Sequence, residues 1–234
     1  AGARPVFADV LPDTFLIDPK DVEKKITKKT KAIMPVHMYG QVCDMGAIMK
    51  IAKKHRLYVL EDSAQCFLGT DERGMIGGTI GHVGSFSTEN SKHVSTGDGG
   101  MLVTNDEVLA ERMRKLGGVG YKNLRALNGQ VRKDKNMFQD PKYLRHDTFG
   151  YNYRLPEVVA AVGLAQVERI DFLVKKRMHI AAKYHKAIGS CAWLIPQHVP
   201  KGSVNSYYTY AVRYEGEKKL GVSFFPQNQF PASV

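Results

Sequence analysis

The stretch LYVLEDSAQ, residues 57–65, indicates the fold class of this chain. Its first four residues are an uninterrupted apolar run, which is typical of a strand that is covered on both faces. Another apolar run, residues 31–37, comes earlier. Between the two lies a segment, residues 45–52, whose apolar side chains recur at helical spacing after a capping Asp44. This strand–helix–strand order predicts a parallel sheet covered by helices.

The remaining elements are predicted from capping residues, helical periodicity and alternation. A change of composition near residue 190 divides the chain into a large domain, residues 1–188, and the start of a small C-terminal domain, residues 189–234. Residues 69–81 are rich in glycine and predict a hairpin or an extended loop, without the G-x-G-x-x-G order of a dinucleotide site. The expected strands are residues 6–10, 82–86, 101–103, 193–196 and 207–213, and the expected helices are residues 19–26, 107–116 and 156–188, the last one bent.

The composition is that of an ordinary globular protein, with 43% hydrophobic and 24% charged residues in a chain of 234. The three cysteines have no CxxC or Cys/His spacing. This argues against a disulfide framework and a structural zinc site, and it suits a reducing compartment. No apolar run has the length of a membrane span. We therefore expect a cytoplasmic protein with no bound metal and no membrane contact.

The formal net charge of +11 suggests an anionic partner. Phosphorylated small molecules and nucleic acids are the two candidates. The densest basic region, residues 122–145, holds seven Lys and Arg against two Asp, but few aromatic residues that could stack on bases. The sequence has no helix-turn-helix, zinc-finger or RNP signature. The charge therefore favours phosphorylated small molecules over nucleic acid, although the basic region could also be a solvated loop.

A second stretch, SFSTENSKHVSTGDGG at residues 85–100, places Lys92 in a polar loop between two apolar runs. Most lysines in such loops are simply solvated. Asp62, however, follows the buried strand at the edge where α/β sheets bind ligands, although alone it could be a cap or turn residue. Pyridoxal phosphate needs a lysine for its aldehyde, a carboxylate for its pyridine nitrogen and donors for its phosphate. Lys92, Asp62 and Ser87 could fill these three roles.

Five short motifs occur in an order that resembles the DegT/DnrJ/EryC1/StrS family of sugar aminotransferases. Each motif alone is weak, but the ordered set is specific, and the resemblance covers the chain from its first residue to about residue 215. The motifs are Pro35–Gln41, Glu61–Gln65, Phe86–Ser87 with Lys92 five residues later, Thr96–Met101, and Gly150–Arg154.

The resemblance implies a fold-type I pyridoxal-phosphate transferase, similar to aspartate aminotransferase, with a mainly parallel sheet in its large domain and part of a smaller α+β domain. It implies that Lys92 is the catalytic Schiff-base lysine and carries protons. It implies that Asp62 pairs with the pyridine nitrogen. The other implied positions are Gln65 near the phenolic oxygen, Ala64 against the ring, Ser87 at the phosphate, Asn152 reaching the phosphate of a neighbouring subunit, Arg154 as a substrate contact or a structural ion pair, and His37 as a residue of the ring pocket on the substrate side or a core histidine.

The implied activity is transfer of an amino group, with glutamate as donor, to a keto group of a nucleotide-diphosphate deoxysugar. Such reactions serve polysaccharide and O-antigen biosynthesis, and the resemblance implies a homodimer with shared active sites. Two alternatives stay open: a non-catalytic or regulatory relative, and a dehydratase of the same fold that uses pyridoxamine phosphate and has histidine in place of the lysine. Lys92 favours transamination. The family's Gly-Thr phosphate loop and ring-stacking aromatic residue do not occur here, so we expect this chain to be a fragment.

Overall fold

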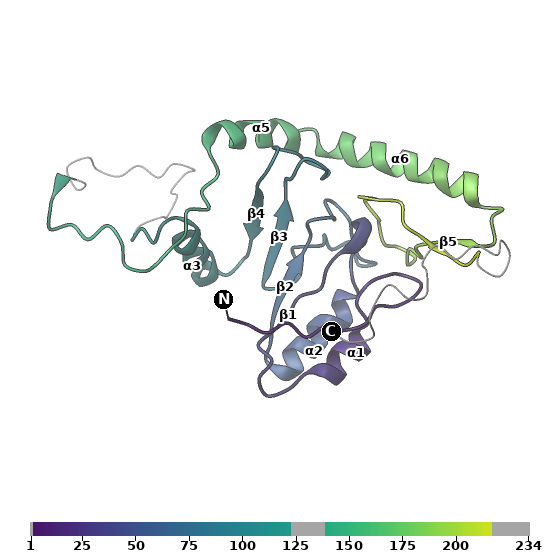
Figure 1. Ribbon diagram of the computed structural model, residues 1–234, viewed down its shortest axis with the longest axis horizontal. Coiled ribbons are helices and arrows are strands. Elements are labelled where there is room, and N and C mark those ends of the chain that lie inside the picture. Colours follow the sequence, from purple (N-terminus) through teal and green to yellow (C-terminus); the bar gives the residue numbers. More distant parts are fainter. Residues whose placement is uncertain (1, 123–138, 217–234) are drawn as a thin grey trace, which may run out of the picture.

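The computed structural model describes residues 2–122 and 139–216. Its main sheet has the strand order β1-β2-β3-β4 (Figure 1). Strands β1, β2 and β3 are parallel, whereas β4 is antiparallel to β3. The predicted α/β fold with a mainly parallel sheet is therefore confirmed. The strands are β1 (Ala32–Ile33), β2 (Tyr58–Asp62), β3 (Val83–Ser87) and β4 (Gly100–Val103).

Two pairs of helices lie on opposite sides of the molecule, and α3 lies near the end of β4 (Figure 1). Helices α1 and α2 lie close to β1 and β2, whereas α5 and α6 run end to end along the opposite side of the molecule, toward which β3 points (Figure 1). None of the helices in the described ranges combines the length and the apolarity needed to cross a membrane. The helices are α1 (Pro19–Lys25), the 3-10 helix η1 (Met38–Gly40), α2 (Met45–His55), α3 (Glu107–Gly117), α5 (Glu157–Val167) and α6 (Ile170–Ile188).

A second, two-stranded sheet follows α6. It pairs β5 (Leu194–Pro196) with β6 (Val212–Tyr214) in antiparallel fashion. Both strands fall within residues 189–234, where the sequence predicts the start of a small domain. Residues 217–234 of that range lie outside the described residues, and the domain division stays a prediction.

The helix starts follow the predicted caps. The carboxylate of Asp18 accepts a hydrogen bond from the N–H of Lys20 over 2.8 Å, and that of Asp44 accepts one from Ala47 over 2.9 Å. Both side chains thus satisfy an N–H group that the first helical turn leaves without a backbone partner. The long bent helix is divided into α5 and α6, since residue 169 leaves the helical conformation with φ −108° and ψ 7°.

The prediction of a strand at residues 6–10 is wrong. Only Val10 forms a single bridge, to Ile17. The N–H of Asp9 donates to the carboxylate of Asp21, and the N–H of Val10 donates to the carboxylate of Asp9. Side chains therefore take the backbone donors that a strand ladder would need.

Two other predicted strands, residues 31–37 and 207–213, are shorter than expected. Pro35 has no N–H to donate, so β1 ends before it. In the second segment the backbone turns at Tyr207, where φ is +50°. The N–H of Tyr207 donates to the side chain of Asn205 over 2.8 Å, and regular pairing begins only with β6.

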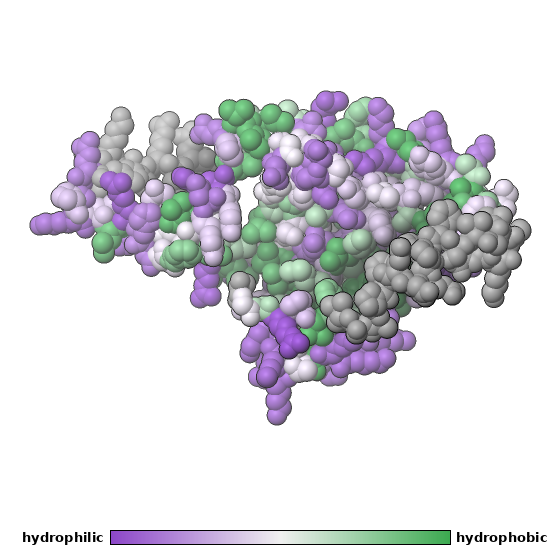
Figure 2. Space-filling view, in the orientation of Figure 1, coloured by the Kyte–Doolittle hydropathy of each residue, from purple (hydrophilic) through white to green (hydrophobic). Residues whose placement is uncertain are grey.

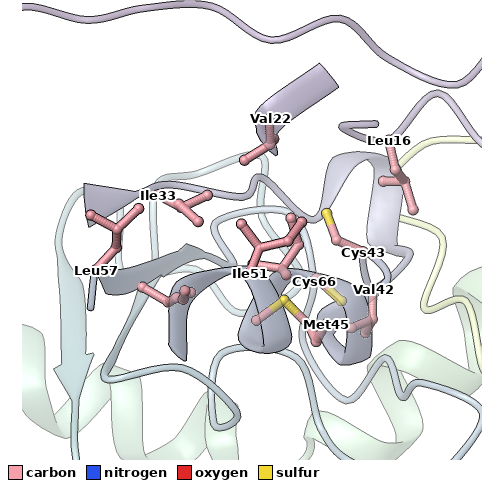
Figure 3. Packing of buried hydrophobic residues seen from close by; sticks show 12 residues of the cluster. Leu16, Val22, Ile33, Val42, Cys43, Met45, Ile51, Leu57 and Cys66 are labelled. Atoms are coloured by element: carbon pink, nitrogen blue, oxygen red, sulfur yellow. The ribbon is translucent and has the colours of Figure 1, made fainter. Parts of the chain in front are cut away.

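The core lies between α2 and the first strands (Figure 3). Helix α2 turns Met45 and Ile48 inward, and neither side chain has any exposed surface. They pack with Ile33 of β1 and with Val59 of β2, which is also fully buried. Burial of apolar side chains is the main favourable term in folding. This core therefore fixes β2, at whose end Asp62 lies.

We predict that Ile48→Ala lowers the free energy of unfolding by about 2–5 kcal/mol, because the change leaves a cavity in a fully packed site. The exposed Lys50 lies in the same helix, and Lys50→Ala should change the free energy of unfolding by no more than about 0.5 kcal/mol. Urea unfolding followed by circular dichroism measures both. Equal losses for the two variants would contradict this description of the core.

Candidate active site

Asp62 and Ser87 end two neighbouring parallel strands, β2 and β3. Asp62 is paired in register with Ser85, and the N–H of Ser63 donates to the carbonyl of Ser85 over 2.8 Å. Ser87 follows Ser85 by two residues, or about 7 Å at the usual rise of a strand. Both side chains therefore belong to the carboxyl edge of the sheet, where α/β proteins bind ligands.

The side chains of Asp62 and Ser87 each retain a polar atom that makes no hydrogen bond within the described residues. Within the described residues, the half-buried Asp62 carboxylate accepts one hydrogen bond, from the N–H of Ala64 to Oδ1 over 3.0 Å. Its second oxygen is free for a ligand. The Ser87 hydroxyl oxygen accepts from the N–H of Glu89 over 3.3 Å. Because it acts there as an acceptor, its hydrogen remains available for donation.

Ala64 and Gln65 follow Asp62 by two and three residues, and both are half-buried. The side-chain oxygen of Gln65 accepts a hydrogen bond from the N–H of Tyr39 in η1 over 2.9 Å. The amide nitrogen of Gln65 makes no hydrogen bond within the described residues. The turn after β2 thus carries a methyl group and an amide donor within three residues of Asp62.

Lys92 follows β3 by five residues and is half-buried. Its backbone N–H donates to the carbonyl of Glu89 over 3.0 Å, which folds residues 89–92 into a turn. Its Nζ lies 4.6 Å from the ring centroid of Tyr208. In the parts of the chain that the structure describes, Nζ has no ion pair and no hydrogen bond. The amine is therefore available for chemistry.

Asn152 and Arg154 lie in the segment that leads into α5, and both are exposed. Nε of Arg154 donates to the side-chain oxygen of Asn152 over 2.9 Å. Asn152 also forms an isolated bridge with Gly118. No described contact joins either residue to Asp62, Ser87 or Lys92. Within the described residues, the polar groups of this pair thus interact with each other and not with those of Asp62, Ser87 or Lys92.

Glu61 lies beside Asp62 and carries a fully buried carboxylate. Its four hydrogen-bond donors are the Nε2 of His37 at 2.9 Å and the N–H groups of Gly78, Ile80 and Gly81. Burial disfavours the charged form, but the hydrogen bonds from His37, Gly81 and Gly78 outweigh it and hold the pKa of Glu61 below its usual value. The carboxylate thus connects β2 to residues 78–81.

His37 is fully buried, and both of its ring nitrogens are engaged. Nε2 faces Glu61, so Nδ1 is left to accept a hydrogen bond from the N–H of Cys43, over 3.2 Å. A side chain with no exposed surface cannot touch a substrate without a rearrangement of the core. The geometry favours the core-histidine alternative over a substrate contact.

His93 directly follows the lysine and was not singled out from the sequence. It is 3% exposed, and its Nε2 donates to the carbonyl of Ser206 over 3.0 Å. Burial is the main cause that lowers the pKa of His93 to about 4; the hydrogen bond to Ser206 opposes this shift, and the nearby charges of Arg177 and Lys92 add to it. The ring is therefore neutral near pH 7, with Nδ1 unprotonated and without a partner within the described residues.

Two further residues contact the lysine loop and were also missed. Arg177 of α6 donates to the backbone carbonyl of Lys92, and the Tyr208 hydroxyl meets the hydroxyl of Ser91. The tyrosine-rich run at residues 207–210 was a signal for Tyr208, although it suggested a strand. Nothing in the sequence distinguishes Arg177 from the other basic residues of its helix.

The groups left free at this edge suit pyridoxal phosphate. They are an amine on Lys92, a carboxylate oxygen on Asp62 and a hydroxyl hydrogen on Ser87, which match the three needs of that cofactor. No set of three or more His, Cys, Asp or Glu side chains in residues 2–122 and 139–216 is arranged to hold a metal ion.

Residues 1–225 match the model of the DegT/DnrJ/EryC1/StrS aminotransferase family. GDP-perosamine synthase of Escherichia coli O157:H7 is 40% identical over 209 residues, which are 89% of this chain and 51% of that protein. A pleiotropic regulatory protein of Geobacillus stearothermophilus is 39% identical over 218 residues, which are 91% of this chain and 53% of that protein.

Among solved structures, an aminotransferase from Psychrobacter cryohalolentis superposes with a TM-score of 0.80 at 32% identity, covering 92% of this chain and 55% of that one. The fold-type prediction agrees with this likeness. The chain spans about half the length of the curated relatives it matches.

We predict that the wild-type protein loses stability relative to His93→Gln as the pH falls from about 6.5 to about 4. Folding keeps His93 neutral down to about pH 4, whereas a histidine in the unfolded chain takes up a proton near pH 6.5. The unfolded state therefore binds more protons in that window, and the relative loss should be on the order of 3 kcal/mol. Glutamine retains an N–H donor for Ser206 and does not titrate. Urea unfolding of both proteins at several pH values measures the difference, and parallel pH curves would contradict it.

Proposed function

The chain belongs to the DegT/DnrJ/EryC1/StrS aminotransferase family, and from that premise we propose that it carries the catalytic lysine of a pyridoxal-phosphate-dependent nucleotide-sugar aminotransferase. The observation that supports the proposal is that three residues with free polar atoms lie at, or directly follow, the carboxyl ends of neighbouring strands. Asp62 and Ser87 end the paired strands β2 and β3, and the Lys92 loop follows β3 directly. Each group has an atom without a partner among the described residues.

The residues have distinct tasks. Asp62 would hold the proton on the pyridine nitrogen, and Ser87 would donate to the phosphate. Ala64 and Gln65 would line the ring, since they follow Asp62 in the turn after β2. Bound pyridoxal phosphate supplies an electron sink for the carbon from which a proton is removed. Lys92 Nζ, which is free of ion pairs in the described parts of the chain, would take that proton and return it.

The acceptor in this proposal is a keto group of a nucleotide-linked deoxysugar, and the donor is glutamate. The names of two relatives support the nucleotide-linked acceptor, since GDP-perosamine synthases of Escherichia coli and Caulobacter vibrioides are 40% and 37% identical to this chain. The formal net charge of +11 suits a diphosphate substrate. Most of the basic segment proposed to meet that diphosphate, residues 122–145, lies outside the described residues.

The proposal includes a homodimer with shared sites. Asn152 and Arg154 are exposed and make no described hydrogen bond or ion pair with Asp62, Ser87 or Lys92 of their own chain, so they are available to a second copy. The helix that follows them, α5, is mostly apolar, yet its side chains Val158 and Leu164 are 79% and 63% exposed. Figure 2 shows a hydrophobic patch over α5. An apolar helix of this kind is normally covered in the assembled protein.

A regulatory role is the second candidate, because one relative at 39% identity is named a pleiotropic regulatory protein. Such a protein could bind the cofactor without transferring an amino group. Turnover with nucleotide keto-sugars and glutamate distinguishes the two. Cofactor binding without turnover over a panel of such sugars would favour the regulatory role.

We predict that Lys92→Ala abolishes the visible absorbance band of the bound cofactor and lowers turnover by about 10²–10⁴-fold, because both need the amine. The measurement is a titration of the complete protein with pyridoxal phosphate, followed by an amino-transfer assay. Lys50→Ala is the control, since Lys50 is exposed on α2 and should keep both properties. If Lys92→Ala keeps the band and the turnover, the proposed function is wrong.

A further inference from the structure

One guanidinium group donates hydrogen bonds to backbone carbonyls of two segments that are far apart in the sequence. Nη2 of Arg177 donates to the carbonyls of Ser91 and Lys92 over 3.2 Å and 3.1 Å, and Nη1 donates to the carbonyl of Tyr208 over 2.9 Å. The donors come from the middle of α6, and the acceptors come from the lysine loop and from the segment before β6. Arg177 thus joins three parts of the fold at the position of Lys92.

These contacts use the geometry that distinguishes arginine from lysine. A guanidinium presents five N–H donors in a rigid plane, so it can satisfy several carbonyls at once. Arg177 is half-buried, and no carboxylate pairs with it in residues 2–122 or 139–216. Hydrogen bonds from a charged donor are stronger than neutral ones. The backbone of Lys92 is therefore strongly held from the side of α6.

Tyr208 holds the same loop through its side chain. The hydroxyl of Ser91 donates to the carboxylate of Glu89, at 2.5 Å, so the Tyr208 hydroxyl is the donor in its 2.8 Å contact with Ser91. The face of the Tyr208 ring lies 4.6 Å from Nζ of Lys92. An ammonium group over an aromatic face is attracted by the negative charge density of the ring. Tyr208 thus contacts the loop beside the lysine and the lysine amine itself.

The residue on the other side of the lysine is tied to the same segment. His93 donates through Nε2 to the carbonyl of Ser206, and its ring centroid lies 6.1 Å from that of Tyr208. The N–H and the hydroxyl of Ser206 both reach the carbonyl of Gly40. The segment 206–208 is therefore itself anchored to the core. The loop on either side of Lys92 is held by a fixed element, whereas the lysine side chain itself has no hydrogen bond within the described residues.

We propose that Arg177 and Tyr208 are positioning residues for Lys92. Arg177 fixes the backbone of the lysine through the carbonyls of Ser91 and Lys92, and the Tyr208 ring holds Nζ when the amine is free. The assignment rests on the proposed function, because it takes Lys92 to be the reactive lysine. It also makes a statement about the cofactor-free protein that can be tested without any activity.

The first test is hydrogen–deuterium exchange of the cofactor-free protein. Arg177→Gln should speed exchange of the backbone amides of residues 88–94 by about tenfold or more, because a loss of about 1.4 kcal/mol already has that effect. Residues 48–52 of α2 serve as an internal reference and should not change. Arg169→Gln is the matched control, since Arg169 is an exposed arginine at the start of α6 whose side chain lies over the Phe172 ring and makes no hydrogen bond or ion pair among the described residues.

The second test follows the rate at which the cofactor-free protein forms its absorbance band after pyridoxal phosphate is added. Arg177→Gln and Arg177→Lys should both slow this step by about tenfold, since a lysine cannot reach carbonyls of two segments at once. Tyr208→Leu should slow it as well. Tyr208→Phe retains the aromatic face and should restore most of the wild-type rate.

The outcomes separate the inference from the function on which it rests. Unchanged exchange of residues 88–94 in Arg177→Gln would overturn the inference even if the enzyme is active. Equal acceleration in residues 48–52 would overturn it too, because Arg177 would then support the fold as a whole. If wild-type protein forms no band, the proposed function is wrong, and exchange alone decides whether the lysine loop is held as described.

Discussion

The buried carboxylate of Glu61 is the interaction on which the site depends. A charge with no exposed surface is tolerated only where donors surround it, and here His37 and the N–H groups of Gly78, Ile80 and Gly81 do so. The demand for those donors brings residues 78–81 against the end of β2 and removes His37 from the surface. Asp62 is the next residue along the strand, so the same network fixes the carboxylate that is free to meet a ligand.

The lysine loop is held in the opposite way, by side-chain donors from other segments that bind its backbone carbonyls and the hydroxyl of Ser91. Arg177 and Tyr208 reach it from elements that follow it by more than 80 residues, and the 206–208 segment in turn binds the carbonyl of Gly40 near the start of α2. A loop that carries a reactive group must be positioned closely for catalysis, since small displacements cost rate. In this chain the strands β2 and β3 fix the positions of Asp62 and Ser87, which end them, whereas long-range hydrogen bonds fix the backbone of Lys92.

Local rules predicted the parts of the fold that depend on local chemistry. The caps Asp18 and Asp44, the buried run of β2 and the division of the long helix all follow from neighbouring residues. The strand at residues 6–10 failed because Asp9 and Asp21 use its backbone donors, which alternation cannot reveal. The polar groups at the sheet edge were found from motif order. Arg177 and Tyr208 were not, because their role arises from contacts between segments about 30 and 85 residues apart.

The most direct test of the central claim is chemical trapping of the lysine. Complete protein loaded with pyridoxal phosphate is reduced with borohydride, digested and mapped by mass spectrometry, so that the modified lysine is identified without an activity assay. We expect the reduced cofactor on Lys92 alone among the lysines of this chain, in near-stoichiometric amount. Modification of another lysine in place of Lys92, or an unmodified Lys92 peptide in protein that retains the cofactor, would contradict the claim that this loop carries the reactive amine.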